Sequence, residues 1–490
     1  MGIGSGTGEL GAAELEELVR LTAGLIRIPS VNPPGDEILA ARFLESVLRA
    51  EGLAATVVEP FPGRGSIVCR VHGDGSGGEP LLLLSHTDVV PADPAGWSHD
   101  PFGGDVADGY VWGRGALDMK GMVAMEAQVM RRLARIARGA GLDPARDAVP
   151  GLRRDVIFCS SADEEDGGAF GAGWIVDEHP EWLRAAGALN EAGGMSVTQG
   201  DTRFYPVQVA EKGYMVYRLH VHGRWGHASV PTDDNAAVIA GRVAARLGVP
   251  GPVRRTPEMD ALLDRALPHL DRAGARMLER LTSEGPATAD DAATPGIDAA
   301  TPAADAAAGE ALDEAVARTC DPVLARTIAA IVRDTASVGV ISAGIRYNVI
   351  PGTAEIEVDC RTLPGTTEEQ MRAELRRRIG DDLWARLDVE LMQIGPAARS
   401  PIDHPLYRVI EDVVKDHDPG GVPLPFLAPF ATDAKHLARI GVPVYGFSPM
   451  ALGKGEGLLD LMHADDERVA VSALAWGLPV LWDVVTRFCR

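Results

Sequence analysis

The stretch "LLLLSHTDVVPADPAGW", Leu81–Trp97, decides the fold class of this chain. Its four leucines predict a buried strand, and this strand leads directly into His86 and Asp88. Residues two apart in an extended segment project from the same face, so the imidazole and the carboxylate leave the strand together. A buried strand that ends in polar side chains is typical of parallel α/β sheets, which place their sites at the carboxyl ends of strands.

Other segments repeat this plan along the chain. Short apolar runs alternate with segments in which apolar residues fall at helical spacing. The expected strands are 155–161, 187–191 and 442–448, and the expected helices are 15–26, 121–138 and 168–177. We therefore expect an α/β fold with a mostly parallel sheet.

The pattern changes near residue 208. The segments 213–223 and 352–363 alternate apolar and polar residues, which predicts strands with one face in water, and helix-like segments accompany them. We expect 1–207 and 396–490 to form one catalytic α/β domain, with 208–395 inserted as a separate α+β domain. Within the insert, about 283–310 is rich in Ala, Asp, Thr and Pro, which predicts a flexible surface tract.

Charge and cysteine content narrow the classes of protein that fit. The 490 residues carry a net charge of −23, which argues against a nucleic-acid partner or an anionic membrane surface. The five cysteines are widely separated, as expected for free thiols in a reducing cytoplasm. No apolar run is long enough for a membrane span, and the N-terminus lacks the pattern of a signal peptide. The sequence predicts a cytoplasmic protein.

Ionisable side chains gather where the expected strands end. Taken singly, each has a structural alternative: a bare His-x-Asp is usually structural, Asp118 could cap the following helix, and four adjacent acids could form a solvated turn. The stretches concerned are "HTD" with His86 and Asp88, "WGRGALDMKG" with Asp118, "SSADEEDGG" with Glu164 and Glu165, "ALNEAGG" with Glu191, and "LMHADDERV" with His463.

Together these groups indicate a metal centre. Two histidines and three carboxylates are too many ligands for one tetrahedral zinc ion and too poor in nitrogen for copper. They suit two divalent ions that share one carboxylate, and the spare glutamate is then free to act as a general base.

The same motifs, taken in order, carry a family resemblance. "HTDVVP", "WGRGALDMKG", "ADEEDGG", "NEAGG", "GHAS", "NVIPG…DCR" and "MHADDERV" resemble the aminoacylase/carboxypeptidase G/succinyl-diaminopimelate desuccinylase family of di-zinc metallohydrolases, from about Leu15 to the C-terminus. The resemblance implies that His86 and Glu191 hold one metal ion, that Glu165 and His463 hold the other, and that Asp118 bridges them.

The resemblance also implies roles beyond the metal ligands. Asp88 would support His86, and Glu164 would be the general base that deprotonates the bridging water and passes the proton to the leaving amine. The peptide bond between Asp118 and Met119 would be cis.

The inserted domain resembles the dimerisation or lid domain of that family. His227 would reach across a homodimer and stabilise the oxyanion in the partner's site. Asn348 and Arg361 would bind substrate, with the arginine clamping a free carboxylate. Without the resemblance, the sequence would indicate only that His227 is a surface histidine and that Arg361 is a charged residue on the solvent-exposed face of a strand.

The implied activity is metal-dependent hydrolysis of an amide or peptide bond that releases an amino acid with a free carboxylate. A dipeptidase or carboxypeptidase is the first expectation, on the resemblance of "GWSHDPFGGDVADGYVWGRG" and "DEHPEW" to that branch. The alternative is an N-acyl-amino-acid deacylase of the acetylornithine or succinyl-diaminopimelate type. Two zinc ions are expected, with cobalt or manganese as alternatives. A scaffold protein that has lost catalysis is the competing class, although all the ligand residues and Glu164 are present.

Overall fold

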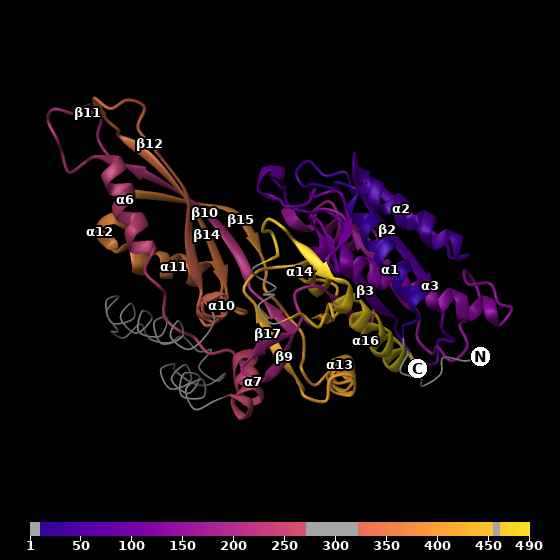
Figure 1. The fold of residues 1–490 in the computed structure, drawn as a ribbon. Coiled ribbons are helices and arrows are strands. Elements are labelled where there is room, and N and C mark those ends of the chain that lie inside the picture. The colour runs from indigo at the N-terminus through magenta and orange to yellow at the C-terminus, as the bar shows by residue number, and fades with distance from the viewer. Residues whose placement is uncertain (1–9, 271–321, 454–460) are drawn as a thin grey trace. The chain divides into compact units, whose positions relative to one another are not determined.

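The computed structural model of the chain describes residues 10–270, 322–453 and 461–490. The chain divides into two compact units (Figure 1). Unit 1 comprises Met1–Val209, Arg399–Phe426 and Thr432–Arg490, and unit 2 comprises Ala210–Ala398 and Leu427–Ala431. The segment expected as an insert was 208–395. The tract at about 283–310 lies outside the described residues.

Unit 1 is built on a mixed sheet whose centre is parallel. The strands follow the order β1-β2-β6-β3-β7-β18-β9-β16, with β8 and β17 pairing to β9. Their bounds are β1 Ala55–Phe61, β2 Arg64–Val71, β3 Leu81–His86, β6 Val156–Ser161, β7 Gly187–Asn190, β8 Val197–Gln199, β9 Thr202–Glu211, β16 Ala398–Arg399, β17 Gly421–Ala428 and β18 Val444–Gly446. The neighbours β6, β3, β7 and β18 pair in parallel, and the flanking pairs β1–β2, β2–β6 and β18–β9 are antiparallel.

The leucines of the opening stretch lie at the centre of this sheet. Leu81 to Leu84 are completely buried: β3 lies between β6 and β7, and helices α3 and α16 pack against the face that carries Leu81 and Leu83. A strand covered on both faces has no wet side, so its sequence is continuously apolar rather than alternating. The fold class expected from this stretch, α/β with a mostly parallel central sheet, is confirmed.

Helices surround the sheet of unit 1. They are α1 Ala12–Ile26, α2 Glu37–Ala50, α3 Gly121–Gly139, α4 Ala172–Glu178, α5 Pro180–Leu183, α13 Pro405–His417, α14 Ala434–Ala438 and α16 Val471–Cys489. A small separate sheet has the order β19-β5-β4, from Arg468–Ala470, Tyr110–Trp112 and Asp105–Ala107. The helix expected over 168–177 is wrong at its start: Gly167 and Gly168 have φ of 101° and 75°, left-handed values that end the preceding turn, and α4 begins only at Ala172.

Unit 2 contains a four-stranded antiparallel sheet in the order β12-β14-β10-β15. These strands are β10 Gly213–His222, β12 Thr335–Ala343, β14 Thr353–Thr362 and β15 Leu387–Gly395. Alternate residues of β10, from Met215 to Val221, are buried in a core shared with α6 (Ala236–Leu247) and α11 (Glu368–Ile379). This is the one-sided burial that the alternating sequence predicts.

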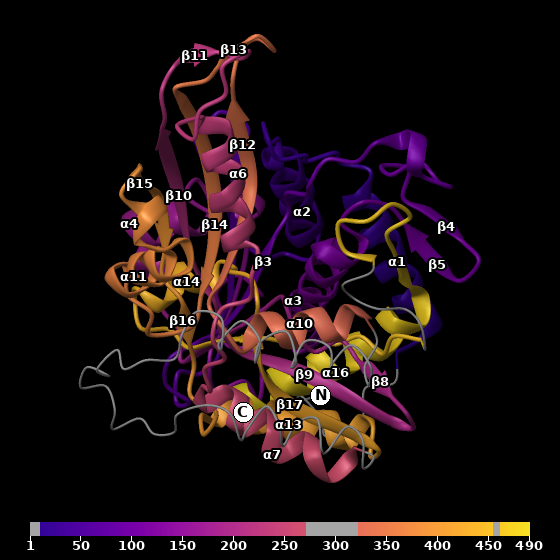
Figure 2. The same ribbon diagram turned by 90° about the vertical axis from the view of Figure 1, so that its left-hand side faces the viewer.

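The other helices and strands of unit 2 among the described residues are short. They include α7 Pro257–Ala266, α10 Pro322–Ile331, α12 Asp381–Trp384, and the two-residue strands β11 Gly226–His227 and β13 Val349–Ile350. β11 and β13 pair with each other at the tip of this unit, beyond the end of α6 (Figure 2).

Candidate metal centre

Asp118 lies at the centre of the candidate site. It belongs to the turn Ala116–Lys120, which joins β5 to α3, and the dihedral angles of Asp118 and Met119 in this turn are not helical. Gly115, at the start of this turn, has φ of 85°, a left-handed conformation that glycine adopts without a steric penalty. The Asp118–Met119 peptide bond is cis, as the family resemblance implied. The Asp118 side chain is buried, with both carboxylate oxygens directed at histidines.

Two groups of side chains converge on Asp118. In the first, Nε2 of His86 lies 3.2 Å from Oδ1 of Asp118 and 3.4 Å from Oε2 of Glu191. In the second, Nε2 of His463 lies 3.0 Å from Oδ2 of Asp118 and 3.4 Å from Oε2 of Glu165. Within each group, one donor atom per residue lies within 4.8 Å of the others. The carboxylate of Asp118 therefore belongs to both groups.

The parallel strands explain why the first members meet. His86 is the last residue of β3 and pairs with Ser161, the last residue of β6, so Glu164 and Glu165 follow at the same edge of the sheet. Glu191 directly follows β7, the other parallel neighbour of β3. Because parallel strands end at a common edge, residues far apart in sequence reach one place.

Burial and mutual repulsion shift the protonation of the carboxylates. Burial, followed by the neighbouring charge of Glu191, raises the pKa of Glu164 well above its usual range. Burial also raises the pKa of Glu191 to about 7 and, together with Asp118, raises that of Glu165. Burial would likewise raise the pKa of Asp118, but hydrogen bonds to the two histidines lower it. Asp118 is therefore the carboxylate held most firmly in its charged form.

The pKa values of the two histidines are raised, which favours positively charged imidazoles beside these acids. Hydrogen bonds to Asp118 and Glu165 raise the pKa of His463 to about 10. Burial would lower the pKa of His86, but Glu191 and Asp118 outweigh burial and raise it. A cluster in which acids and imidazoles shift one another so strongly is a candidate functional site.

Asp88 joins the His86 side of the site to the acidic turn. Its Oδ1 lies 3.4 Å from Nδ1 of His86, and its two oxygens accept hydrogen bonds from the backbone N–H groups of Glu164 and Glu165 at 3.2 and 3.0 Å. A carboxylate that fixes an imidazole from the side opposite its ligand atom is a common partner of metal-binding histidines. Asn32 donates a further hydrogen bond to Asp88 at 2.9 Å.

Sequence reasoning missed the buried groups that surround Asp88. Asn32 also donates to Asp163, and the buried Arg64 bonds Asn32 and pairs with Asp163 and Glu37. Asn32 stands in "SVNPPGDE", a stretch whose two prolines and glycine stop the preceding helix. A polar residue directly ahead of two prolines was the sequence feature that could have marked Asn32 as a candidate. Arg64 had no such feature, because nothing in the neighbouring sequence indicates that it is buried.

The donor set fits a pair of divalent ions. Five side chains offer imidazole nitrogen and carboxylate oxygen, the ligands that zinc and its neighbours accept, and one carboxylate is shared. Among the described residues, Oε1 of Glu165 is a buried carboxylate oxygen without a hydrogen-bond partner. A buried carboxylate oxygen is costly to leave unpaired, and a cation satisfies it.

The three candidate residues of unit 2 lie in two different places. His227, on β11, pairs with Val349 on β13, and the N–H of Ala228 donates to the carbonyl of Asn348, so His227 and Asn348 share the exposed tip. Arg361 pairs with Tyr214 near the start of β10, at the opposite end of β14. The eight residue-to-residue steps from Thr353 to Arg361 span roughly 26 Å at ~3.3 Å each. One copy of unit 2 does not bring Arg361 to His227.

Arg361 has a carboxylate partner within the chain. Its Nε and one terminal nitrogen donate to the two oxygens of Asp359 at 2.7 and 2.9 Å, and its guanidinium lies over the ring of Tyr214. Both charged groups are half-buried.

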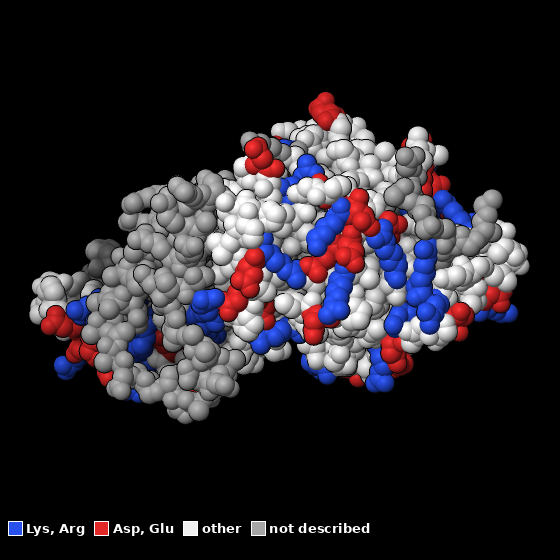
Figure 3. All heavy atoms as spheres, turned by 90° about the horizontal axis from the view of Figure 1, so that it is seen from below, with Lys and Arg blue, Asp and Glu red and all other residues white. Residues whose placement is uncertain are grey.

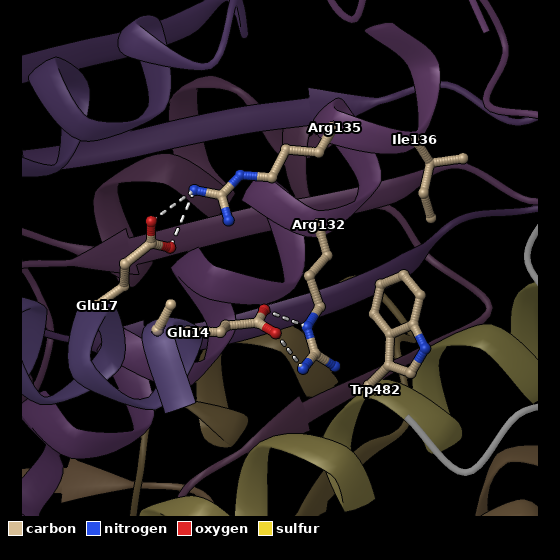
Figure 4. A pocket seen from close by; sticks show the side chains of 7 residues that line it. Glu14, Glu17, Arg132, Arg135, Ile136 and Trp482 are labelled. Atoms are coloured by element: carbon tan, nitrogen blue, oxygen red, sulfur yellow. Dashed lines mark hydrogen bonds and ion pairs between the residues drawn. The ribbon is translucent and has the colours of Figure 1, made fainter. Parts of the chain in front are cut away.

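A pocket in unit 1, away from the candidate metal ligands, has a structural explanation. It has a volume of about 450 Å³ and is lined by residues of α1, α3 and α16 (Figure 4). Its charges pair with one another: Arg132 donates to Glu14 at 2.8 Å, Arg135 donates to Glu17 at 3.0 Å, and Arg132 also lies over the ring of Trp482. Basic and acidic side chains are likewise interleaved on the face shown in Figure 3. We assign these ion pairs to helix packing.

The chain resembles characterised proteins along nearly its whole length. It is 28% identical over 489 residues to the N-fatty-acyl-amino acid synthase/hydrolase PM20D1 of Xenopus tropicalis, covering 95% of this chain and 85% of that protein. It is 28% identical over 488 residues to human aminoacylase-1, covering 97% and 95%. In structure it resembles an M20 family metallo-carboxypeptidase from Sulfolobus solfataricus, with a TM-score of 0.64 at 14% identity over 96% of this chain and 99% of that one.

A family model also matches most of the chain. Peptidase family M20/M25/M40 matches residues 82–487, a range that contains both groups of ligand side chains. None of the described helices is both long and apolar enough to cross a membrane. The protein is a hydrolase of the peptidase/aminoacylase type, and the chain belongs to Peptidase family M20/M25/M40.

Proposed function

We propose that this protein hydrolyses an amide bond and releases an amino acid with a free carboxylate, using two divalent metal ions. The observation that carries the proposal is the shared carboxylate of Asp118, which lies 3.2 Å from His86 and 3.0 Å from His463. His86 and Glu191 hold one ion, Glu165 and His463 hold the other, and Asp118 belongs to both. We propose zinc, with cobalt and manganese as alternatives, because all three accept nitrogen and carboxylate ligands. When bound, such ions polarise the scissile carbonyl and lower the pKa of water.

Glu164 is the proposed general base. It stands next to the ligand Glu165 in the turn after β6, and its Oε2 lies 4.0 Å from Nε2 of His86, yet it belongs to neither ligand group. It accepts a proton from the attacking water and delivers it to the leaving nitrogen, as a carboxylate within reach of both atoms can do. Asp88 holds the backbone N–H groups of Glu164 and Glu165, so it positions the base and a ligand together.

His227 and Arg361 are proposed to serve one substrate from two copies of the chain. The two residues lie at opposite ends of β14, so a single copy of unit 2 cannot present both to one scissile bond. We propose that Arg361 clamps the free carboxylate of the substrate through its planar guanidinium, replacing Asp359 as its partner. His227 and Asn348 come from the partner subunit, and His227 stabilises the oxyanion.

If Arg361 and His227 come from different copies of the chain, the protein must form a homodimer, and we propose that it does so through unit 2. β12 lies at the edge of its sheet and exposes Val340 and Ile341 at 49% and 50%. Beyond it, Ile345 and Tyr347 are 84% and 92% exposed. A strand edge that exposes apolar side chains favours pairing with another chain, and a second copy offers the same edge. Unit 2 would then act as the dimerisation and lid domain.

Two substrate classes remain within this proposal. Two relatives that match nearly the whole chain in sequence are named as an N-fatty-acyl-amino acid synthase/hydrolase and an aminoacylase, which favours an N-acyl-amino-acid deacylase. The segment "GWSHDPFGGDVADGYVWGRG", which contains β4 and β5, favours the dipeptidase and carboxypeptidase class because it resembles that branch in sequence. Both classes have the same leaving group, an amino acid with a free carboxylate, and they differ on the acyl side of the bond.

A substrate panel tests the proposal. Purified protein is stripped with a chelator, reloaded separately with zinc, cobalt or manganese, and offered N-acyl amino acids of increasing chain length, dipeptides, and matching amides whose carboxylate is blocked. Hydrolysis should require metal and the free carboxylate. Turnover of N-acyl amino acids above dipeptides assigns a deacylase, and the reverse order assigns a dipeptidase. Full activity after complete metal removal would contradict the proposal.

A further inference from the structure

Two buried side chains connect the turn of Asp118 to the loop of His463. They are Arg114 and Glu467, which are 2% and 0% exposed and belong to neither ligand group. One terminal nitrogen of Arg114 donates to Oε2 of Glu467 at 2.7 Å. Arg114 stands four residues before Asp118, and Glu467 stands four residues after His463. The ion pair therefore crosses between the two segments that carry these ligands.

Glu467 holds the backbone of the Asp118 turn. Its Oε1 accepts hydrogen bonds from the N–H groups of Leu117 at 2.9 Å and Asp118 at 3.2 Å, and its Oε2 accepts one from Gly115 at 3.0 Å. A carboxylate that accepts three backbone N–H groups and one guanidinium has its hydrogen-bonding capacity nearly filled. The direction of the Asp118 side chain depends on this backbone, so Glu467 sets where the shared carboxylate lies.

Arg114 holds the backbone of the His463 loop. Its two terminal nitrogens donate to the carbonyls of Ala464 at 3.0 Å and His463 at 3.2 Å. His463 and Asp466 have φ of 60° and 59°, a left-handed conformation that residues with a Cβ adopt only where the surroundings hold them. The His463 side chain is also 49% exposed, so packing contributes little to its position.

We propose that Glu467 and Arg114 are positioning residues that fix the separation of Asp118 and His463, and thereby set the affinity of the Asp118/Glu165/His463 group for its metal ion. This inference rests on the proposed metal centre. Glu467 and Arg114 touch no substrate; they act by holding two ligands at the spacing that one ion needs. Loss of partners that orient metal ligands typically lowers metal affinity by about 10–100-fold.

The test is a metal titration of the full-length chain carrying Glu467→Gln. The wild type, this variant and the control Asp483→Asn are stripped of metal and titrated with zinc against a chromophoric chelator, and melting temperatures are recorded without metal. Asp483 is also a buried carboxylate of unit 1, with Nε2 of His417 at 2.9 Å. Glu467→Gln should weaken the zinc site of Asp118, Glu165 and His463 about 10–100-fold, and the other site also through the shared Asp118, whereas Asp483→Asn should lower only the melting temperature.

A second variant keeps the inference falsifiable if Glu467→Gln does not fold. Arg114→Lys retains the positive charge beside Glu467, but one ammonium group cannot reproduce the fork that spans three acceptors. It should fold and weaken mainly the site that contains His463, because Arg114 holds the backbone of that loop. The inference is wrong if either folded variant binds two zinc ions as tightly as the wild type. Wild-type protein that binds no stoichiometric metal would instead contradict the proposed function itself.

Discussion

Oδ2 of Asp118 lies 3.0 Å from Nε2 of His463, although 345 residues separate the two in sequence. The other oxygen of the same carboxylate lies 3.2 Å from His86. A carboxylate whose two oxygens face two imidazoles is the geometry expected of a ligand shared by two ions.

Replacing the shared carboxylate should remove both metal ions. We expect Asp118→Asn to bind less than one zinc ion per chain and to lose at least about three orders of magnitude in kcat/KM, because a neutral amide is a weak metal ligand. Metal content by atomic emission and steady-state kinetics check this. Asp105→Asn, which changes an exposed carboxylate on β4, should keep both properties. Two bound ions in Asp118→Asn would disprove the shared-ligand assignment.

Glu164 should be needed for turnover but not for binding of the metal ions. Glu164→Ala is expected to retain both ions and its melting temperature while kcat falls by several orders of magnitude, because proton transfer is lost while the ligands remain. Asp166→Asn, in the same acidic turn but exposed, is the matched control and should stay active. Near wild-type kcat in Glu164→Ala would show that another group is the base.

Donation of His227 across a dimer predicts complementation. His227→Ala and Glu164→Ala should each be inactive alone, and subunits refolded together should recover about a quarter of wild-type activity, because half of the dimers are mixed and each holds one intact site. Activity is measured after mixing and compared with unmixed variants at equal concentration. No recovery in dimers shown by mass spectrometry to be mixed would rule out donation between subunits.

The exposed edge of β12 should hold the dimer together. Val340→Asp places a charge on that edge and should shift the protein from dimer to monomer in light scattering, because a buried unpaired carboxylate destabilises an interface. Val106→Asp, at an equally exposed valine of β4, should leave the oligomeric state unchanged. If the proposed roles of unit 2 are correct, the monomeric variant also loses activity. A Val340→Asp protein that remains dimeric would place the interface elsewhere.

Glu126 should make the free energy of unfolding decrease as the pH rises. It is completely buried on α3, and burial raises its pKa to about 8 from a usual value near 4.5. Between about pH 4.5 and pH 8, Glu126 therefore keeps its proton in the folded protein but has lost it in the unfolded chain. The stability that the protonated Glu126 contributes is fully present below about pH 4.5 and is lost as the pH rises to about 8. Relative to the wild type, Glu126→Gln should be stabilised by on the order of 4 kcal/mol at pH 8 and by almost nothing at pH 4.5.

Denaturant melts of Glu126→Gln across this range check the sign. Glu16→Gln, at an exposed position of α1, is the control and should show no pH-dependent gain. A gain in Glu126→Gln that is equal at pH 4.5 and pH 8 would mean that the buried carboxyl does not change charge over that window.

Local patterns in the sequence carried much of the fold. The continuous leucines predicted a strand buried on both faces, and β3 is such a strand. The alternation in 213–223 predicted a half-buried strand, and β10 has that pattern. The antiparallel flanks β1, β2 and β9 were not predicted, because pairing direction depends on which strands become neighbours rather than on local periodicity. The late start of α4 followed from two left-handed glycines.

The chain's own order of residues determined which groups were available for chemistry and that His86 and the acidic turn of Glu164 and Glu165 come at the ends of buried strands. Only the tertiary structure decided that Asp118 lies between His86 and His463, that Glu467 spans the Asp118 turn, and that Arg361 is remote from His227. The physical reason is the range of the forces. Side-chain periodicity and turn preferences act between residues a few positions apart. The meeting of distant segments is decided by the packing of whole strands and helices, and by buried polar groups that must find partners.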